Sequence, residues 1–150
     1  MTMLALIPRR WTSRSLSING RAPRVLVVDD NSNAADALAV YLGFSRLDVR
    51  VVYDGAAAIA TALSWRPDVV LLDISMPVVD GFVVAKTLRD NARTSGAFIV
   101  ALTAHDEGFV RQRAAESEFD AYCQKGQVLD TLSQLLTTLT HGVGHSRIAR

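Results

Sequence analysis

The sequence has little cysteine, no long apolar run and no internal repeat, and each absence excludes a class of protein. One cysteine among 150 residues excludes a disulfide framework and a metal site built from several thiolates. No stretch approaches the roughly 18 apolar residues of a membrane-spanning helix, so we expect no membrane association. The chain is nevertheless 49% hydrophobic and 21% charged, which is typical of one globular domain with its own core.

Acidic residues are absent from the first 24 positions, which hold five arginines, whereas the rest of the chain carries all 15 acidic residues. The apolar stretch 1–7 precedes these arginines, an order that does not fit a secretory signal, and we expect a cytoplasmic protein. We interpret residues 1–22 as a disordered basic leader whose deletion leaves folding unchanged. An arm for an acidic partner and a targeting peptide are the alternatives.

Short apolar runs alternate with stretches of helical period between residue 24 and about residue 139. The runs indicate five strands, at 25–28, 49–53, 69–72, 98–102 and 121–123. The first and third are unbroken and apolar, which is typical of strands covered on both faces. Five such units predict an α/β fold with an open parallel sheet between layers of helices, because a closed barrel would need eight.

In open sheets of this class, functional residues collect at the carboxyl ends of the strands. Asp29 and Asp30 follow the first strand, Asp73 the third, Thr103 the fourth and Lys125 the fifth. Three converging carboxylates stay ionised together only with a cation among them. Oxygen ligands without His or Cys favour Mg²⁺, with Mn²⁺ as a substitute.

Two other interpretations of these residues compete with a metal site. Each aspartate could simply cap the helix after its strand. Capping explains one aspartate well, but it does not explain the pair Asp29 and Asp30 together with Asp73 and Lys125. A flavin or dinucleotide site would use the same edge of the sheet. However, the loop after the first strand has two negative charges and no glycine with which to hold a phosphate.

Four motifs together resemble the receiver domain of the two-component response regulators. They are residues 24–31 (RVLVVDDN), 67–81 (PDVVLLDISMPVVDG), 101–104 (ALTA) and 122–125 (YCQK). The resemblance covers residues 24 to about 139. It implies a flavodoxin-like, doubly wound five-stranded parallel sheet in the order 2-1-3-4-5, flanked by five helices. The expected receiver domain spans residues 23–140, followed by a flexible tail, 141–150.

The resemblance also implies how the strand ends work. Asp73 is expected to accept a phosphoryl group from a histidine kinase or a histidine phosphotransfer protein. Asp30, Asp73 and the backbone carbonyl of Ser75 are expected to bind magnesium directly, and Asp29 through water.

Other residues are expected to respond to the phosphoryl group. Thr103 and Lys125 would contact it, and Tyr122 would change rotamer on activation. Three positions are expected to line the rim of the site: Ser75, Ala104 and His105. The His105 side chain would hydrogen-bond the phosphoryl group or a water molecule, or is simply an exposed loop residue.

The chain departs from the family pattern after Lys125, where Gly126 stands in place of the usual proline. A cis bond at a residue other than proline costs roughly 2.5–4 kcal/mol. We therefore expect the loop after Lys125 to be trans, looser or differently placed.

These features predict a stand-alone phosphoacceptor response regulator, not an enzyme acting on a separate substrate. Nothing after residue 140 is long enough for a DNA-binding domain, so we expect output through protein contact or onward phosphotransfer. By resemblance, the partner surface is the last two helices and the fifth strand, including Phe109 and Tyr122. The sequence leaves open whether the chain forms a homodimer. The alternatives are a degenerate receiver that binds a partner without phosphorylation and a metal-dependent phosphohydrolase.

Overall fold

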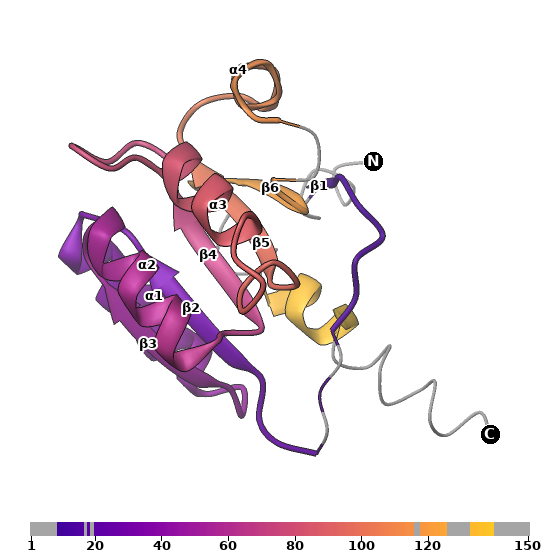
Figure 1. Cartoon of the computed structure of the whole chain (residues 1–150). Coiled ribbons are helices and arrows are strands. Elements are labelled where there is room, and N and C mark those ends of the chain that lie inside the picture. The colour runs from indigo at the N-terminus through magenta and orange to yellow at the C-terminus, as the bar shows by residue number, and fades with distance from the viewer. Residues whose placement is uncertain (1–8, 17, 19, 116–117, 126–132, 140–150) are drawn as a thin grey trace, which may run out of the picture.

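Five parallel strands and one short antiparallel strand form a single sheet. The computed structural model describes residues 9–16, 18, 20–115, 118–125 and 133–139. The strands are β1 (Arg9–Arg10), β2 (Arg24–Val28), β3 (Asp48–Val52), β4 (Val69–Asp73), β5 (Phe98–Thr103) and β6 (Ala121–Gln124). They lie in the order β1-β6-β5-β4-β2-β3 (Figure 1). The predicted order of the five parallel strands, 2-1-3-4-5, is therefore confirmed, with β1 added at one edge.

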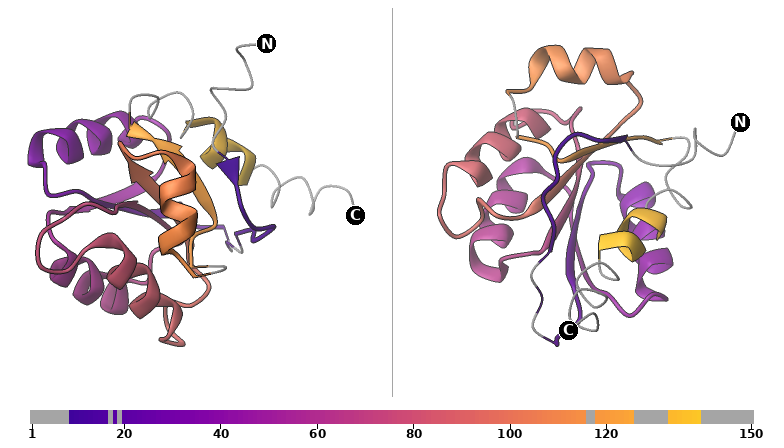
Figure 2. Two further views of the ribbon diagram at one scale, coloured as in Figure 1. Left: turned by 90° about the horizontal axis from the view of Figure 1, so that it is seen from above. Right: turned by 90° about the vertical axis from the view of Figure 1, so that its right-hand side faces the viewer.

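Helices cover both faces of this sheet (Figure 2). They are α1 (Ser32–Gly43), α2 (Gly55–Trp65), α3 (Gly81–Arg89), α4 (Glu107–Arg113) and a helical stretch at residues 133–139. The four labelled helices each begin at a polar residue whose side chain accepts a hydrogen bond from the backbone N–H three residues later: Asn31, Asp54, Asp80 and Asp106. These side chains satisfy donors that the first turn of a helix leaves without partners.

The central strands β2, β4 and β5 are buried along nearly their whole length, which explains their unbroken apolar sequences. Successive residues of β2 point to opposite faces. Val25 and Val27 pack in a cluster with α1 and residues 133–139, whereas Leu26 and Val28 pack in a cluster with α2 and α3. The two cores hold the strands side by side and bring their carboxyl ends to one edge of the molecule.

The expectation of a disordered leader over residues 1–22 is wrong for residues 9–16. β1 pairs antiparallel with β6, placing Arg9 opposite Tyr122 and Arg10 opposite Ala121 (Figure 1). The backbone N–H of Trp11 then donates to the Asp120 carbonyl at 2.7 Å. The unpaired edge of β6 supplies the hydrogen-bonding groups that give this segment its fixed path.

Several expectations fall on residues outside those described. Residues 1–8, Gly126 with its loop, and the tail 141–150 belong to this group. Among the described residues, no helix is both long and apolar enough to cross a membrane.

Candidate functional site

The carboxyl ends of β2 and β4 bring three aspartates together. Asp29 and Asp30 directly follow β2, and Asp73 is the last residue of the neighbouring strand β4. One carboxylate oxygen from each lies within 4.8 Å of the other two. Asp29 and Asp73 are buried, while Asp30 is exposed. The predicted convergence of these carboxylates is thus what the structure shows.

None of the three aspartates caps a helix. Asn31 caps α1 and Asp80 caps α3. The carboxylates of Asp29 and Asp73 instead accept hydrogen bonds from the backbone N–H two residues later, from Asn31 at 3.0 Å and Ser75 at 3.1 Å. The helix-capping interpretation of these aspartates is therefore wrong, and their carboxylates turn toward one another and the strand ends.

Lys125, at the end of β6, extends into the same cluster. Its Nζ lies 2.9 Å from Asp29 Oδ2 and 3.4 Å from Asp73 Oδ2. Burial favours the neutral amine, but the hydrogen bond to Asp29 and the charge of Asp73 outweigh it, so the pKa of Lys125 is raised. The ammonium supplies the one positive charge that the described residues direct at Asp73.

Burial is the main influence on Asp73. It raises the pKa of this carboxyl from 3.8 to about 6, with the Asp29 charge acting in the same direction. The hydrogen bond from Ser75 and the charge of Lys125 oppose the shift. A cation among the carboxylates would favour the ionised form. Three carboxylates without His or Cys are the donor set that a hard divalent cation prefers, so the residues present fit Mg²⁺.

Thr103 and Tyr122 are linked through one loop residue. Thr103 is fully buried at the end of β5, and its Oγ1 accepts a hydrogen bond of 3.0 Å from the backbone N–H of His105. The carbonyl of His105 accepts a bond of 2.6 Å from the hydroxyl of Tyr122, which is itself buried. The two residues predicted to switch together are therefore joined by the backbone of His105.

The predicted rim residues lie in exposed loops. Ser75, Ala104 and His105 are all exposed at the ends of β4 and β5. The His105 ring stacks on Phe109 with 4.2 Å between ring centroids. Its backbone, more than its imidazole, connects it to Thr103 and Tyr122.

Sequence reasoning missed the surroundings of Tyr122, above all Trp11. The two rings are parallel, with an interplanar angle of 2° and centroids 6.3 Å apart. The indole Nε1 donates to Glu107 Oε2 of α4 at 2.6 Å, and the Arg111 guanidinium lies 4.3 Å from the centre of the Trp11 ring. A tryptophan inside an otherwise basic, polar segment is the one signal that could have drawn attention to it.

The sequence of residues 25–137 matches a family model for the response regulator receiver domain. The chain belongs to the response regulator receiver domain family. It is the receiver domain of a two-component response regulator, and the matched region holds every predicted site residue, from Asp29 to Lys125.

Named relatives agree with this assignment of the receiver domain. It is 39% identical over 111 residues to the transcriptional regulatory protein PrrA of Mycobacterium tuberculosis, covering 74% of this chain and 47% of PrrA. It is 33% identical over 103 residues to the DNA-binding dual master transcriptional regulator RpaA of a Synechocystis species, covering 69% of this chain and 43% of RpaA. The chain thus matches less than half the length of these relatives.

Solved structures resemble the receiver domain as well. The chemotaxis protein CheY4 of Vibrio cholerae superposes with a TM-score of 0.73 at 26% identity, covering 79% of this chain and 98% of CheY4. The receiver domain of the sensor histidine kinase PA1611 from Pseudomonas aeruginosa gives 0.72 at 25% identity, covering 79% of this chain and 97% of the other. That structure has a magnesium ion coordinated in its active site cleft.

Proposed function

We propose that this receiver domain accepts a phosphoryl group on Asp73 from a phosphohistidine donor, in a magnesium-dependent reaction. The donor is a histidine kinase or a histidine phosphotransfer protein. The observation that carries the proposal is the convergence of Asp29, Asp30 and Asp73 with Lys125 at one edge of the sheet. The phosphorylated domain signals by protein contact or by passing the phosphoryl group onward.

The reaction is a displacement at phosphorus. A carboxylate oxygen of Asp73 forms a bond to phosphorus while the bond between phosphorus and the donor imidazole breaks. The electron pair of that bond stays on the imidazole nitrogen, and one proton from water leaves a neutral histidine beside the acyl phosphate. The carboxylate must be ionised to attack. With a pKa of about 6 in the absence of metal, Asp73 is largely ionised at neutral pH.

Charge neutralisation is the main task of the surrounding residues, because phosphoryl transfer spreads negative charge over the phosphoryl oxygens. Asp29, Asp30, Asp73 and the Ser75 carbonyl would hold Mg²⁺, which would neutralise this charge when bound. Lys125 already lies against Asp29 and Asp73, so its ammonium can exchange a carboxylate oxygen for a phosphoryl oxygen.

Thr103 provides the link to the rest of the molecule. Its hydroxyl is available as a donor while its oxygen accepts from His105. A phosphoryl group on Asp73 would draw this hydroxyl inward and leave volume beside Tyr122. The equilibrium between positions of Tyr122 and α4 then shifts, which changes the surface that α4 and β6 offer to partners.

Labelling with a small phosphoryl donor tests this proposal. Incubating the chain with acetyl phosphate and Mg²⁺ should add one phosphoryl group, measured by intact-protein mass spectrometry, and hydroxylamine should remove it. Asp73→Asn should abolish labelling, because an amide cannot form the acyl phosphate. Chelation of Mg²⁺ should prevent labelling of the unmodified chain.

Asp90→Asn is the matched control, since Asp90 is an exposed aspartate at the end of α3. This variant should be labelled like the unmodified chain. Equal labelling of the unmodified chain and Asp73→Asn would refute Asp73 as the acceptor. A folded chain that is not labelled at all would identify a degenerate receiver instead.

A further inference from the structure

The segment 9–16, called the arm below, crosses the edge of β6 from one face of the sheet to the other. Trp11 packs beside the core cluster of α2 and α3, whereas Leu16 is buried in the cluster of α1 and residues 133–139. Just before Trp11, β1 pairs with β6 (Figure 1), and between Trp11 and Leu16 the side chains of Thr12 and Arg14 bind Asp120. The arm therefore occupies a sheet edge that would otherwise present unpaired backbone groups to a partner strand.

The Trp11 end of the arm connects β6 to α4. Its ring stacks on Tyr122 and meets Phe119 edge to face, with 6.5 Å between centroids. Its Nε1 donates to Glu107, which also pairs with Arg9 at 3.3 Å. The Trp11 ring, which has arginines on either side of it in the sequence, thus packs on a surface made of the Tyr122 ring and the Glu107 carboxylate.

α4 is attached to the domain near both of its ends: Phe109 packs against the core cluster of α2 and α3, Arg113 lies 4.9 Å from the centre of the Phe82 ring, and Glu107 contacts the arm. The helix is seven residues long, and among its residues only Val110 is buried. The contacts that Glu107 makes with Trp11 and Arg9 join its first turn to the arm, which in turn pairs with β6. Loss of the Trp11 contacts would loosen that turn.

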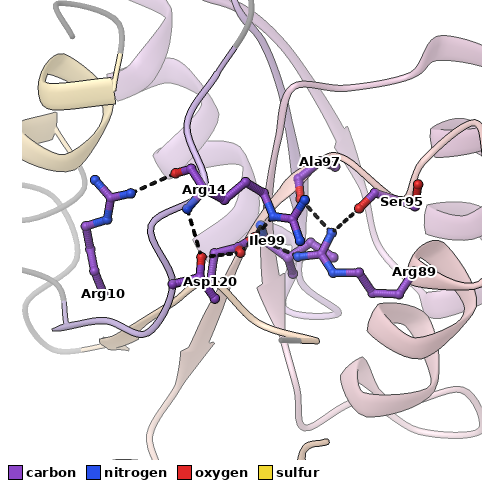
Figure 3. Close-up of polar contacts among 8 residues, drawn as sticks. Arg10, Arg14, Arg89, Ser95, Ala97, Ile99 and Asp120 are labelled. Carbon is purple, nitrogen blue, oxygen red and sulfur yellow. Dashed lines mark hydrogen bonds and ion pairs between the residues drawn. The ribbon is translucent and has the colours of Figure 1, made fainter. Parts of the chain in front are cut away.

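The other end of the arm is held separately, by a buried ion pair. Arg14 Nε lies 2.9 Å from Asp120 Oδ1 (Figure 3). The Thr12 hydroxyl donates to the same oxygen at 2.6 Å. Asp120 has no exposed surface, whereas Trp11 is half-buried. The Trp11 ring can consequently leave its site while Arg14 and the backbone bonds to Asp120 keep the arm tethered at high effective concentration.

We propose that the arm is an intramolecular competitor at the surface formed by α4, Tyr122 and the edge of β6, which is part of the surface expected above to bind partners, and that it competes there with an extended partner segment carrying an aromatic residue flanked by arginines. The arm fills this surface in cis, and its docking is coupled to the occupancy of the Asp73 site. This coupling rests on the proposed phosphoacceptor function. The contacts run from Thr103 through the backbone of His105 to Tyr122, and from Tyr122 to Trp11.

The direction of the coupling follows from the position of Tyr122. Trp11 stacks on Tyr122 while the tyrosine is buried and bonded to His105. A phosphoryl group that draws Thr103 inward favours this buried position and therefore favours docking of Trp11. Linkage is reciprocal, so a docked arm must strengthen binding at Asp73 by the same factor. A partner with the same chemistry must displace Trp11 before it can bind.

Hydrogen exchange of the full chain tests the proposal, with Mg²⁺ and beryllofluoride as a stand-in for the phosphoryl group. Saturating beryllofluoride should slow exchange in peptides covering Asp73 and Thr103, and also in the peptide covering residues 9–14. Slower exchange at Asp73 and Thr103 with no change in residues 9–14 would refute the coupling and leave the proposed function standing. No change in any peptide would refute both.

The reciprocal measurement uses Trp11→Ala. Its apparent affinity for beryllofluoride should fall at least about fivefold, the lower end of ordinary allosteric coupling. Trp11→Phe keeps a ring but loses the bond to Glu107, so its affinity for beryllofluoride should lie between those of the unmodified chain and Trp11→Ala. Phe44→Ala is the control, because Phe44 is an aromatic residue with 84% of its surface exposed and lies outside the arm and its surface. Equal affinities of Trp11→Ala and Phe44→Ala would overturn the proposal.

Discussion

Asp120 lies just before β6 with no exposed surface, and four donors converge on its two carboxylate oxygens. Thr12 and Arg14 of the arm bind Oδ1, while Arg89 of α3 and the backbone N–H of Ile99 bind Oδ2. Figure 3 shows Arg14, Arg89 and Ile99 around Asp120. Burial lowers the pKa of Arg89, although the charge of Asp120 opposes this effect. One carboxylate thus joins the arm, α3 and β5, and a buried charge is tolerated because each oxygen has charged and neutral partners.

Asp120→Asn should lower the free energy of unfolding by about 3–5 kcal/mol, the usual result of removing one charge from a buried ion pair. An amide has one oxygen and one NH₂ group, so the NH₂ group would face hydrogen-bond donors where a carboxylate oxygen now accepts from them. Urea unfolding followed by circular dichroism measures the change. Asp90→Asn, on the exposed surface, should stay within about 0.5 kcal/mol. A loss below about 1 kcal/mol in Asp120→Asn would show that the network is not stabilising.

Asp73 should make stability depend on pH in the metal-free chain. Burial raises the pKa of Asp73 to about 6, so the folded chain binds this proton more tightly than the unfolded chain. The stabilisation is complete below the unfolded pKa, about 4, and is lost as pH rises through about 6. Relative to Asp73→Asn, the free energy of unfolding should fall over this window by about 2–3 kcal/mol.

Urea unfolding of both proteins in chelator, from pH 4 to pH 7.5, measures this difference. Using Asp73→Asn as the reference at each pH removes the contributions of the other titrating groups. A difference in unfolding free energy that does not vary with pH would contradict a raised pKa of the buried Asp73 carboxyl.

At the scale of elements, the sequence predicted what local patterns determine. Unbroken apolar runs identified β2 and β4, and the aspartates, Thr103 and Lys125 at the strand ends identified the site, because parallel strands bring like ends together. β1 has no comparable signal. It is two residues long, too short for any periodicity, and it pairs with β6 more than 100 positions away in the chain. Only the tertiary structure supplies its partner.

Gly81, the first residue of α3, should be intolerant of a side chain. A Cβ there would lie 2.5 Å from Ile74 Cα and 2.7 Å from the carbonyl oxygen of Asp73. Gly81→Ala should therefore cost about 1–3 kcal/mol of unfolding free energy and displace the start of the loop that follows Asp73. Gly43→Ala is the control, since no atom lies within 4 Å and alanine favours the helix by up to about 1 kcal/mol. Similar effects of the two variants in thermal unfolding would contradict this close approach.

At the scale of the whole molecule, the unequal distribution of charge joins the arm to the domain. The first 24 residues have five arginines and no acid, yet the chain as a whole has a net charge of +1. Arg9 pairs with Glu107, Arg14 with Asp120 and Arg21 with Asp68. Exposed pairs contribute little, so the buried one at Asp120 is the energetically important member. The basic segment that suggested a leader is therefore complementary to the acidic domain behind it.

Deleting residues 1–22 should consequently destabilise the domain, contrary to the expectation for a disordered leader. The deletion removes Arg14 from Asp120 and takes Leu16 and Ile18 out of the core. Burial of the two apolar side chains alone contributes about 1.5–3 kcal/mol each, against a total stability of about 5–15 kcal/mol for a domain. We expect the truncated chain to unfold at a markedly lower urea concentration than the full chain. Deleting residues 1–8 removes none of these contacts and should leave the midpoint within error; if both deletions behave alike, the arm does not stabilise the domain.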